Sequence, residues 1–154
     1  MNPFDVIVRV QADYARCIDD DRLESWPDYF DDPCTYLITT AANYREGLQA
    51  GIVFATSRGM LVDRVSALRE ANIYERHAYR HILGLPAILS QEGDRVRSET
   101  PFLVARIMRD GETDIFATGR YLDVYRIADG KARLAERSVI CDSSRIDTLL
   151  ALPL

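Results

Sequence analysis

The sequence predicts an α+β domain in which helices pack in the concave side of a long, curved and mostly antiparallel sheet. Helical periodicity dominates the chain to about residue 71, and four β-type runs follow from residue 82 onward. Asp-Gly pairs, the strongest short hairpin signal, separate the later runs. Helices first and strands afterwards is the order of an α+β fold rather than of alternating βαβ units. A chain of 154 residues is predicted to form one domain over residues 1–154.

The composition argues against several classes of protein. With 47% hydrophobic and 28% charged residues, the chain resembles an ordinary globular protein. Its net charge of −5 argues against non-specific binding to nucleic acid. No apolar run approaches the ~18–20 residues of a membrane span, and the N-terminus lacks the basic start of a signal peptide. Three unpatterned cysteines, Cys17, Cys34 and Cys141, fit reduced, buried thiols. We therefore expect a cytoplasmic protein with no membrane contact.

The first predicted helix begins with Asn2 as its cap and Pro3 at its first position. Its apolar face continues to about Asp19, and the run Asp19–Asp21 is interpreted as a solvated helix end or as a second cap. That face holds Phe4, Ile7, Val8, Ala15 and Ile18.

A short aromatic helix is predicted next, because Leu23, Trp26, Tyr29 and Phe30 recur at helical spacing. Pro33 is expected to end it. The apolar, partly β-branched run Cys34–Thr39 predicts a strand, and residues 40–56 predict a loop with possible helical turns.

A third helix is predicted after Ser57, which can cap its first turn. Its apolar stripe consists of Met60, Leu61, Val65, Leu68 and Ala71, with Asp63, Arg64, Arg69 and Glu70 on or beside the other face. The connector over residues 72–81 has no helical period and is rich in Arg and Tyr. Because these residue types are enriched at the centres of protein interfaces, we predict that the connector contacts a partner.

The four β-type runs are Ile82–Ser90, Arg95–Arg109, Thr113–Ala128 and Lys131–Asp142, and they predict an antiparallel meander. The third run carries apolar residues at period two, interrupted at Asp123: Ile115, Ala117, Gly119, Tyr121, Tyr125 and Ile127. Its other face holds Phe116, Leu122 and Val124. A strand that is apolar on much of both faces is covered on both sides, so the outer face is expected to meet a neighbour.

This order of elements resembles the cystatin-like α+β cone of the nuclear-transport-factor superfamily. Within it, the chain is similar along essentially its whole length to the small (β) subunit of Rieske-type aromatic ring-hydroxylating dioxygenases. Its runs DRVSALREANIYERHAYRHILGLP and ARIMRDGETDIFATGRYLDVY, with DTLLALPL at the end, are most similar to the terephthalate branch of that family. Shorter signatures are Trp26, residues 29–32, Tyr36, and residues 63–65, 80–82, 116–121 and 137–142. Many relatives carry a longer segment before the first helix, whose contacts we expect to be missing or replaced.

The resemblance implies a non-catalytic subunit that supports the assembly of metal-bearing α subunits for aromatic catabolism. The Rieske 2Fe-2S cluster and the mononuclear Fe(II) are then expected in the α subunit, with NAD(P)H acting through a separate reductase. The implied assembly contains three α and three β subunits, with the β subunits forming a trimer. No catalytic, cofactor-binding or metal-binding residue is assigned to this chain. The residues predicted at a subunit interface are Arg64, Tyr74, Arg76, Tyr79, Arg80 and His81.

The two histidines, His77 and His81, are four residues apart, but the signature of a helical zinc site is incomplete because Ala78 follows His77. We predict instead that His81 is structural and hydrogen-bonded near a sheet edge to a carboxylate such as Asp63.

A standalone dehydratase or isomerase is the alternative, since other cone-fold proteins are enzymes. Its cavity could draw on Tyr14, Tyr29, Asp63, His81, Tyr121 and Asp123. Against this alternative, Phe102, Val104, Leu122 and Val124 are predicted to fill the cone.

Arginines and acids interleave through the second half of the chain. We expect at least one Arg–carboxylate cluster to lie at an interface, where it contributes more than an exposed pair does. The arginines concerned are Arg64, Arg69, Arg76, Arg80, Arg120, Arg126, Arg133 and Arg137.

Overall fold

The computed structural model describes residues 2–47, 51, 53–70, 77–145 and 152–154. Its helices are α1 (Pro3–Asp19), the 3₁₀ helix η1 (Leu23–Tyr29), α2 (Ala41–Arg45) and α3 (Arg58–Glu70). Its strands are β1 (Phe30–Thr40), β2 (Val53–Ala55), β3 (His77–Leu83), β4 (Ala87–Glu92), β5 (Arg95–Met108), β6 (Thr113–Ala128) and β7 (Lys131–Cys141). None of the described helices is long and apolar enough to cross a membrane.

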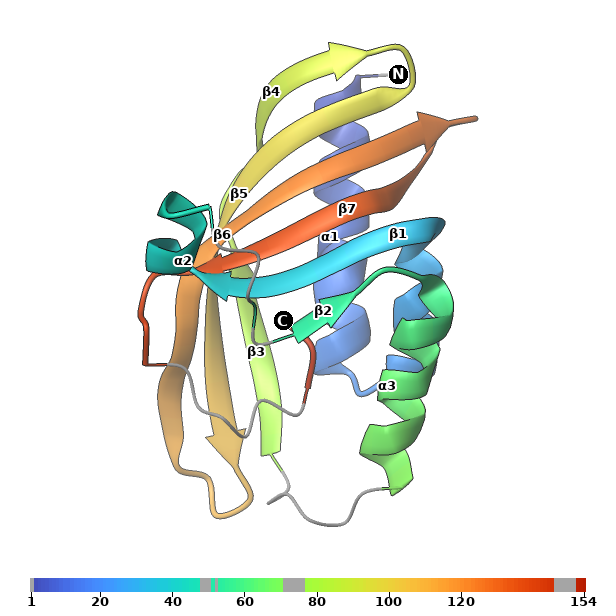
Figure 1. Ribbon diagram of the computed structural model, residues 1–154. Helices are drawn as coiled ribbons and strands as arrows, with labels where there is room; N and C mark the ends of the chain where they lie inside the picture. The colour runs from blue at the N-terminus through green and yellow to red at the C-terminus, as the bar shows by residue number, and fades with distance from the viewer. Residues whose placement is uncertain (1, 48–50, 52, 71–76, 146–151) are drawn as a thin grey trace.

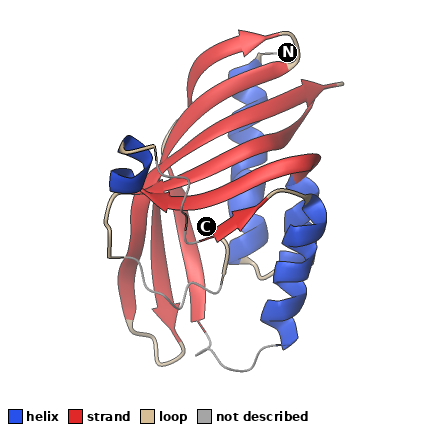
Figure 2. Ribbon diagram, in the orientation of Figure 1, coloured by secondary structure: helices blue, strands red, loops and turns tan. Residues whose placement is uncertain are grey.

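The strands form one sheet in the order β2-β1-β7-β6-β5-β3, and β4 pairs with β5 beyond the end of β3. All neighbouring strands are antiparallel except β1 and β7, which are parallel. The sheet is strongly curved, and α1 runs across one face of it while α3 packs beside η1 and β1 (Figures 1 and 2). This arrangement is the predicted α+β fold, with the meander from β4 to β7 confirmed.

The inner face of β6 contributes a row of buried residues to the core. Ala117, Gly119, Tyr121, Asp123 and Tyr125 alternate along the strand and are all buried. The predicted period of two is therefore confirmed over this stretch, and Asp123 belongs to the buried row. A side chain at position 119 would collide with the main chain of β7 at Ile140, so the close approach of the strands requires glycine.

Two predictions about the interior were wrong. Leu122 and Val124 do not fill the cone, because alternation along β6 places them on the opposite face, where they are half-buried. Ile115 is 66% exposed, because it lies near the tip of the β5–β6 hairpin, outside the buried stretch. Phe102 and Val104 are buried as predicted.

The first and third helices agree with the prediction in position and capping. Asn2 accepts a hydrogen bond from the Phe4 N–H at 3.0 Å, and Ser57 accepts one from the Met60 N–H at 3.2 Å. The buried stripe of α3 is narrower than predicted, since Leu61 and Val65 are buried whereas Met60 is 43% exposed. Ala71 lies outside the described residues.

The region after η1 differs from the prediction. Pro33 does not end the short helix; it lies within β1, where pairing with β7 is interrupted between Phe30 and Thr35 and no ladder N–H is needed. The segment predicted as loop contains α2 and also β2, a short edge strand that pairs with residues 36–38 of β1. Three residues are too few for a recognisable alternating pattern, so sequence reasoning missed β2.

The predicted strand Ile82–Ser90 is two strands, and the first begins inside the predicted connector at His77. Gly84 and Pro86 separate them. The Gly84 N–H donates to the Pro101 carbonyl at 2.9 Å, and a Cβ at Gly84 would collide with the Pro101 ring. β3 then pairs with the second half of β5, and β4 pairs with its first half.

Candidate functional site

Asp19 and His81 form a buried pair between the end of α1 and strand β3. The Asp19 carboxylate accepts the His81 main-chain N–H at 2.8 Å and lies 2.7 Å from His81 Nδ1. The two side chains are only 3% and 0% exposed. The hydrogen bond predicted between His81 and a carboxylate is confirmed, but the carboxylate belongs to Asp19 rather than to Asp63. The Asp19 side chain is therefore buried, in contrast to the solvated helix end predicted from the sequence. Asp63 is exposed on α3.

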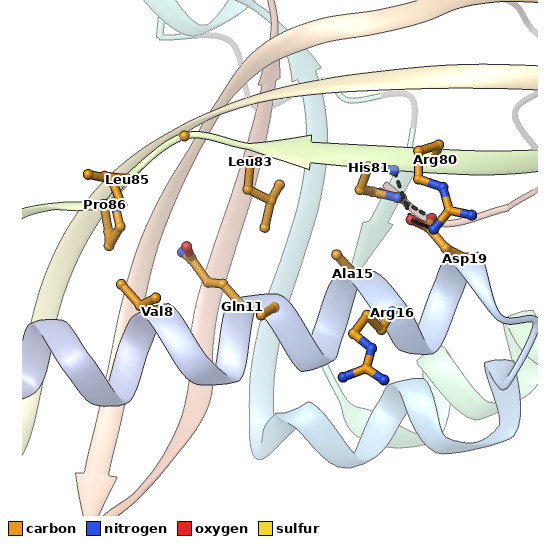
Figure 3. A pocket seen from close by; sticks show the side chains of 12 residues that line it. Val8, Gln11, Ala15, Arg16, Asp19, Arg80, His81, Leu83, Leu85 and Pro86 are labelled. Carbon is orange, nitrogen blue, oxygen red and sulfur yellow. Dashed lines mark hydrogen bonds and ion pairs between the residues drawn. The ribbon is translucent and has the colours of Figure 1, made fainter.

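A cavity of about 310 Å³ lies between α1 and the β3–β4 junction, with the Asp19–His81 pair at one end (Figure 3). Its walls are mainly apolar, while Arg16 and Arg80 add two guanidinium groups. Arg80 is 65% exposed and lies 4.0 Å from Asp19. The Nε2 atom of His81 is buried and has no hydrogen-bond partner among the described residues. The lining residues are Val8, Gln11, Ala12, Ala15, Arg16, Asp19, Arg80, His81, Leu83, Gly84, Leu85 and Pro86.

Arg137 and Asp123 form a second buried pair, opposite each other on β7 and β6. Arg137 donates from Nε and Nη2 to the two carboxylate oxygens of Asp123, both at 2.9 Å, and from Nη2 to the Tyr125 hydroxyl at 3.1 Å. Its guanidinium carbon lies 4.4 Å from the Tyr14 ring centroid and 3.9 Å from that of Tyr121. The charge of the Arg137 guanidinium is thus neutralised by a carboxylate, and the same group contacts two aromatic rings.

The electrostatics of this pair follow from complete burial. Burial is the largest single effect and opposes the charge on Arg137, but the carboxylate of Asp123 together with Tyr125 and Tyr14 outweighs it and raises the pKa of the guanidinium well above its usual value. Burial also raises the pKa of the Tyr125 hydroxyl, although Arg137 opposes the rise. Asp123 is buried and bound by Arg137 on both oxygens, so it does not lie within reach of a substrate, as a general base must.

The residues predicted for a dehydratase or isomerase cavity do not converge on one point. Tyr14, Tyr121 and Asp123 surround Arg137, and the Tyr29 ring lies 5.7 Å from that of Tyr14. Asp63 is on the exposed side of α3, and His81 is at the sheet edge with Asp19. These residues therefore do not place an acid and a base around one common position for a substrate, as such a mechanism needs.

The interior of the cone is also occupied by the chain itself. Leu152 and Leu154 are 7% and 0% exposed and belong to the same buried cluster as Trp26 and Tyr36. The hydroxyls of Tyr14 and Tyr36 donate to the Leu154 main-chain oxygen at 2.9 and 3.1 Å. Composition and periodicity give no sign of this contact, since it joins residues at opposite ends of the chain.

The predicted interface residues fall in different environments. Arg80 is exposed and Arg64 is half-buried, whereas Tyr79 and His81 are buried within the chain. Tyr79 stacks on Phe116, with 5.2 Å between the ring centroids. Tyr74 and Arg76 lie outside the described residues, as does the first half of the predicted connector, residues 72–76.

His77 and His81 lie on β3, so four residues separate them by about 13 Å along an extended strand rather than bringing them onto one helical face. Within the described ranges there is no group of three or more His, Cys, Asp and Glu side chains that could hold a metal ion. Cys17, Cys34 and Cys141 are free and buried, as predicted.

Several arginines form ion pairs within the chain. Arg69 on α3 binds Asp21 and Glu24 at 2.9 and 2.8 Å, and Arg126 on β6 binds Asp31 at 2.7 Å. Arg120 pairs with Glu99 across β5 and β6 at 2.6 Å. These pairs connect elements of one chain, so they do not by themselves mark an interface.

Known protein sequences show what this chain is similar to. A family described as the ring hydroxylating beta subunit matches residues 13–148. The chain is 56% identical over 148 residues to subunit beta 2 of the terminal oxygenase component of terephthalate 1,2-dioxygenase from Comamonas sp, with 96% of each chain covered. It is 43% identical to the anthranilate 1,2-dioxygenase small subunit of Burkholderia cepacia, covering 96% of this chain and 92% of that one.

Solved structures give the same result for the fold. The beta subunit of a putative aromatic-ring-hydroxylating dioxygenase from Novosphingobium aromaticivorans superposes with a TM-score of 0.91 at 42% identity, covering 98% of this chain and 96% of that one. A putative scytalone dehydratase from the same organism superposes with a TM-score of 0.70 at 17% identity, covering 97% and 91%. The second likeness concerns the fold alone, and together they confirm the predicted cone.

Proposed function

Since the chain belongs to the family of ring-hydroxylating β subunits, we propose that it is the structural, non-catalytic β subunit of an aromatic-ring dioxygenase that acts on terephthalate. The observation that carries this proposal is the 56% identity to a terephthalate dioxygenase β subunit over 96% of both chains. The match includes the core of the fold and the segments between its elements, so it extends beyond a shared cone.

The site geometry supports a structural role. Within the described part of the chain, the buried carboxylates of Asp19 and Asp123 are each held by a partner, at distances of 2.7–2.9 Å. The cone interior contains Leu154 rather than an open pocket with converging acids and bases. A standalone dehydratase or isomerase needs those groups free and facing a substrate, so the alternative has less support.

The cofactors of the reaction belong, in this proposal, to a partner α subunit. A Rieske cluster needs two histidines, and a mononuclear iron with two histidines and a carboxylate needs two more. This chain has two histidines in all, and His81 is already bound to Asp19. The α subunit therefore holds the 2Fe-2S cluster and the Fe(II), and a separate reductase delivers electrons from NAD(P)H.

The assembly proposed is cytoplasmic, with three α and three β subunits and the β subunits in contact as a trimer. Its support on this chain is the exposed apolar surface at the β3–β4 edge. Ile82, Leu85 and Leu89 are 58%, 74% and 51% exposed there, and Arg80 lies on the same strand as Ile82. Several exposed large apolar side chains within one short segment of a chain are consistent with an interaction surface.

Co-purification with an α subunit tests the proposal. The chain is expressed alone and together with the Rieske α subunit of a terephthalate dioxygenase, and the mass of each product is measured by light scattering. We expect a brown complex with equal numbers of α and β chains that oxidises terephthalate when its reductase is added. A chain that remains alone and colourless in the presence of that α subunit would contradict the proposal.

A further inference from the structure

The interior of the cone binds the end of the described chain as a ligand would be bound. The main-chain oxygen of Leu154 accepts hydrogen bonds from the Tyr14 hydroxyl at 2.9 Å and from the Tyr36 hydroxyl at 3.1 Å. The Leu154 N–H in turn donates to the Tyr36 hydroxyl at 3.1 Å. One residue thus has both of its main-chain polar groups held by side chains from α1 and β1, while its own side chain is fully buried.

The groups that hold Leu154 are fixed in advance by their neighbours. Trp26 Nε1 donates to the Tyr14 hydroxyl at 3.0 Å, which orients that hydroxyl toward Leu154. The Trp26 and Tyr36 rings meet edge to face, with 5.2 Å between their centroids. Burial raises the pKa of both tyrosines, so both remain protonated donors at neutral pH. A few hydrogen-bond donors, held in a fixed position in an apolar site, are what such a site commonly uses to bind an oxygen atom of a ligand.

Further donors border the same interior. The Tyr121 hydroxyl and Arg137 Nη1 are buried and have no hydrogen-bond partner among the described residues. Tyr121 and Arg137 are 0% and 1% exposed, and the Tyr14 ring contacts the Arg137 guanidinium. Tyr14 and Tyr121 both contact the Arg137 guanidinium, so the unpaired donors belong to the same group of side chains as one of the hydroxyls that hold Leu154. Buried donors are nearly always paired, so these unpaired ones point to a ligand with more acceptor atoms than Leu154 offers.

We propose that the cone interior is a binding site for a small apolar compound with a carboxylate, and that residues 152–154 occupy it in the same chain. Tyr14 and Tyr36 receive one carboxylate oxygen where they now hold the Leu154 oxygen. Arg137 Nη1 and the Tyr121 hydroxyl supply donors for the second oxygen. The aromatic walls formed by Trp26, Phe30 and Tyr36 accept the apolar body. This site stands apart from the proposed function, because it concerns the β chain alone.

Removal of residues 152–154 tests the site, with benzoate as the probe and isothermal calorimetry as the measurement. We expect the shortened chain to bind benzoate at least about tenfold more tightly than the full chain does. The peptide Ala-Leu-Pro-Leu should displace the benzoate, since it restores the natural occupant. Tyr36→Phe in the shortened chain should weaken benzoate binding about tenfold, whereas Tyr44→Phe, at a tyrosine that is 43% exposed, should not.

The proposal is overturned if the folded, shortened chain binds no benzoate, binds it as weakly as the full chain, or is insensitive to Tyr36→Phe. Circular dichroism establishes folding before each titration. Where the deletion prevents folding, the full-length Leu154→Ala variant carries the test, because it keeps the main-chain hydrogen bonds and loses only apolar contact. The Leu154→Ala variant should bind benzoate more tightly than the unsubstituted full-length chain, and an unchanged affinity would overturn the proposal. Assembly with an α subunit is a separate measurement, so failure here leaves the proposed function unaffected.

Discussion

The carboxylate of Asp19, the last residue of α1, binds both the main-chain N–H and the ring of His81 on β3. β3 ends the strand order of the sheet, so a free N–H there could pair with another chain. The contact therefore does two things: it fixes the end of α1 on the sheet, and it covers a main-chain donor of an edge strand.

Asp19→Ala should lower the free energy of unfolding by about 2–4 kcal/mol, because it leaves a buried N–H and a buried imidazole without their acceptor. Urea unfolding followed by circular dichroism measures the change. Asp20→Ala is the matched control, since Asp20 is 53% exposed and only loosely paired with Arg22 at 3.6 Å. Equal effects of the two substitutions would contradict the role given to Asp19.

Arg137→Met should cost about 3–5 kcal/mol of stability, because it leaves the carboxylate of Asp123 buried without a counter-charge. The double variant Arg137→Met/Asp123→Leu should recover much of this loss, since neither charge remains. Thermal or urea unfolding measures both. Arg97→Met, on the exposed side of β5, is the control and should change little. The single variant Asp123→Leu completes the comparison. A double variant whose loss of unfolding free energy equals the sum of the losses in the two single variants would contradict the pairing.

Arg80→Ala should weaken assembly with the α subunit without changing the product of the reaction. Arg80 is 65% exposed and lies 4.0 Å from the Asp19 carboxylate, so its loss should leave the stability of the isolated chain unchanged. We expect the dissociation constant of the complex to rise at least about tenfold, measured by light scattering or calorimetry. Arg22→Ala, another exposed and loosely paired arginine, is the control. Normal assembly with an altered product would rule out the interface role.

The thiol of Cys141 should be unreactive in the folded protein. Burial, reinforced by the nearby Asp142, raises the pKa of this thiol to about 12, so almost no thiolate is present near pH 8. Cys17 and Cys34 are also buried, and burial raises the pKa of each. A chromogenic disulfide reagent should therefore react slowly with the native chain and rapidly with three thiols in urea. Rapid release of any thiol from the native chain would contradict this prediction.

The pair of Asp31 and Arg126 should make stability depend on acid pH. Two hydrogen bonds from Arg126, at 2.7 and 2.8 Å, lower the pKa of Asp31 below its unfolded value. The stabilisation is present above the unfolded pKa, near 3.9, and is lost as the pH falls through the lower folded value. Asp31→Asn should thus be less stable than the parent chain at neutral pH, and this difference should shrink as the pH falls below the unfolded pKa. A pH-independent difference in urea unfolding would contradict the assignment.

Most of the elements were predictable because their signals are local. Asn2 and Ser57 cap the two long helices where the sequence places them, and the Asp-Gly pairs at residues 110–111 and 129–130 lie in the two predicted hairpin turns. Caps and turns depend on neighbours within a few residues, so the chain carries their signals directly.

The partners of buried polar groups were less predictable, and the β6–β7 hairpin shows why. Counting outward from Asp129–Gly130 pairs Ala128 with Lys131, and the same count continued without interruption would place Asp123 opposite Glu136. A register shift between Val124 and Tyr125 brings Arg137 opposite Asp123 instead. A bulge of this kind has no clear local signature, yet it replaces a repulsive pair with a buried ion pair.

By itself the sequence determined the helices, the meander, the period of the buried strand and, through its likeness to a family, the kind of subunit. The tertiary structure alone decided that His81 is held by Asp19 rather than Asp63, and that Leu154 lies between Tyr14 and Tyr36. Periodicity and turns are set by neighbouring residues, whereas these contacts join positions 62 to 140 residues apart. Contacts at such separations form only when the curved sheet closes around α1, so the fold selects them.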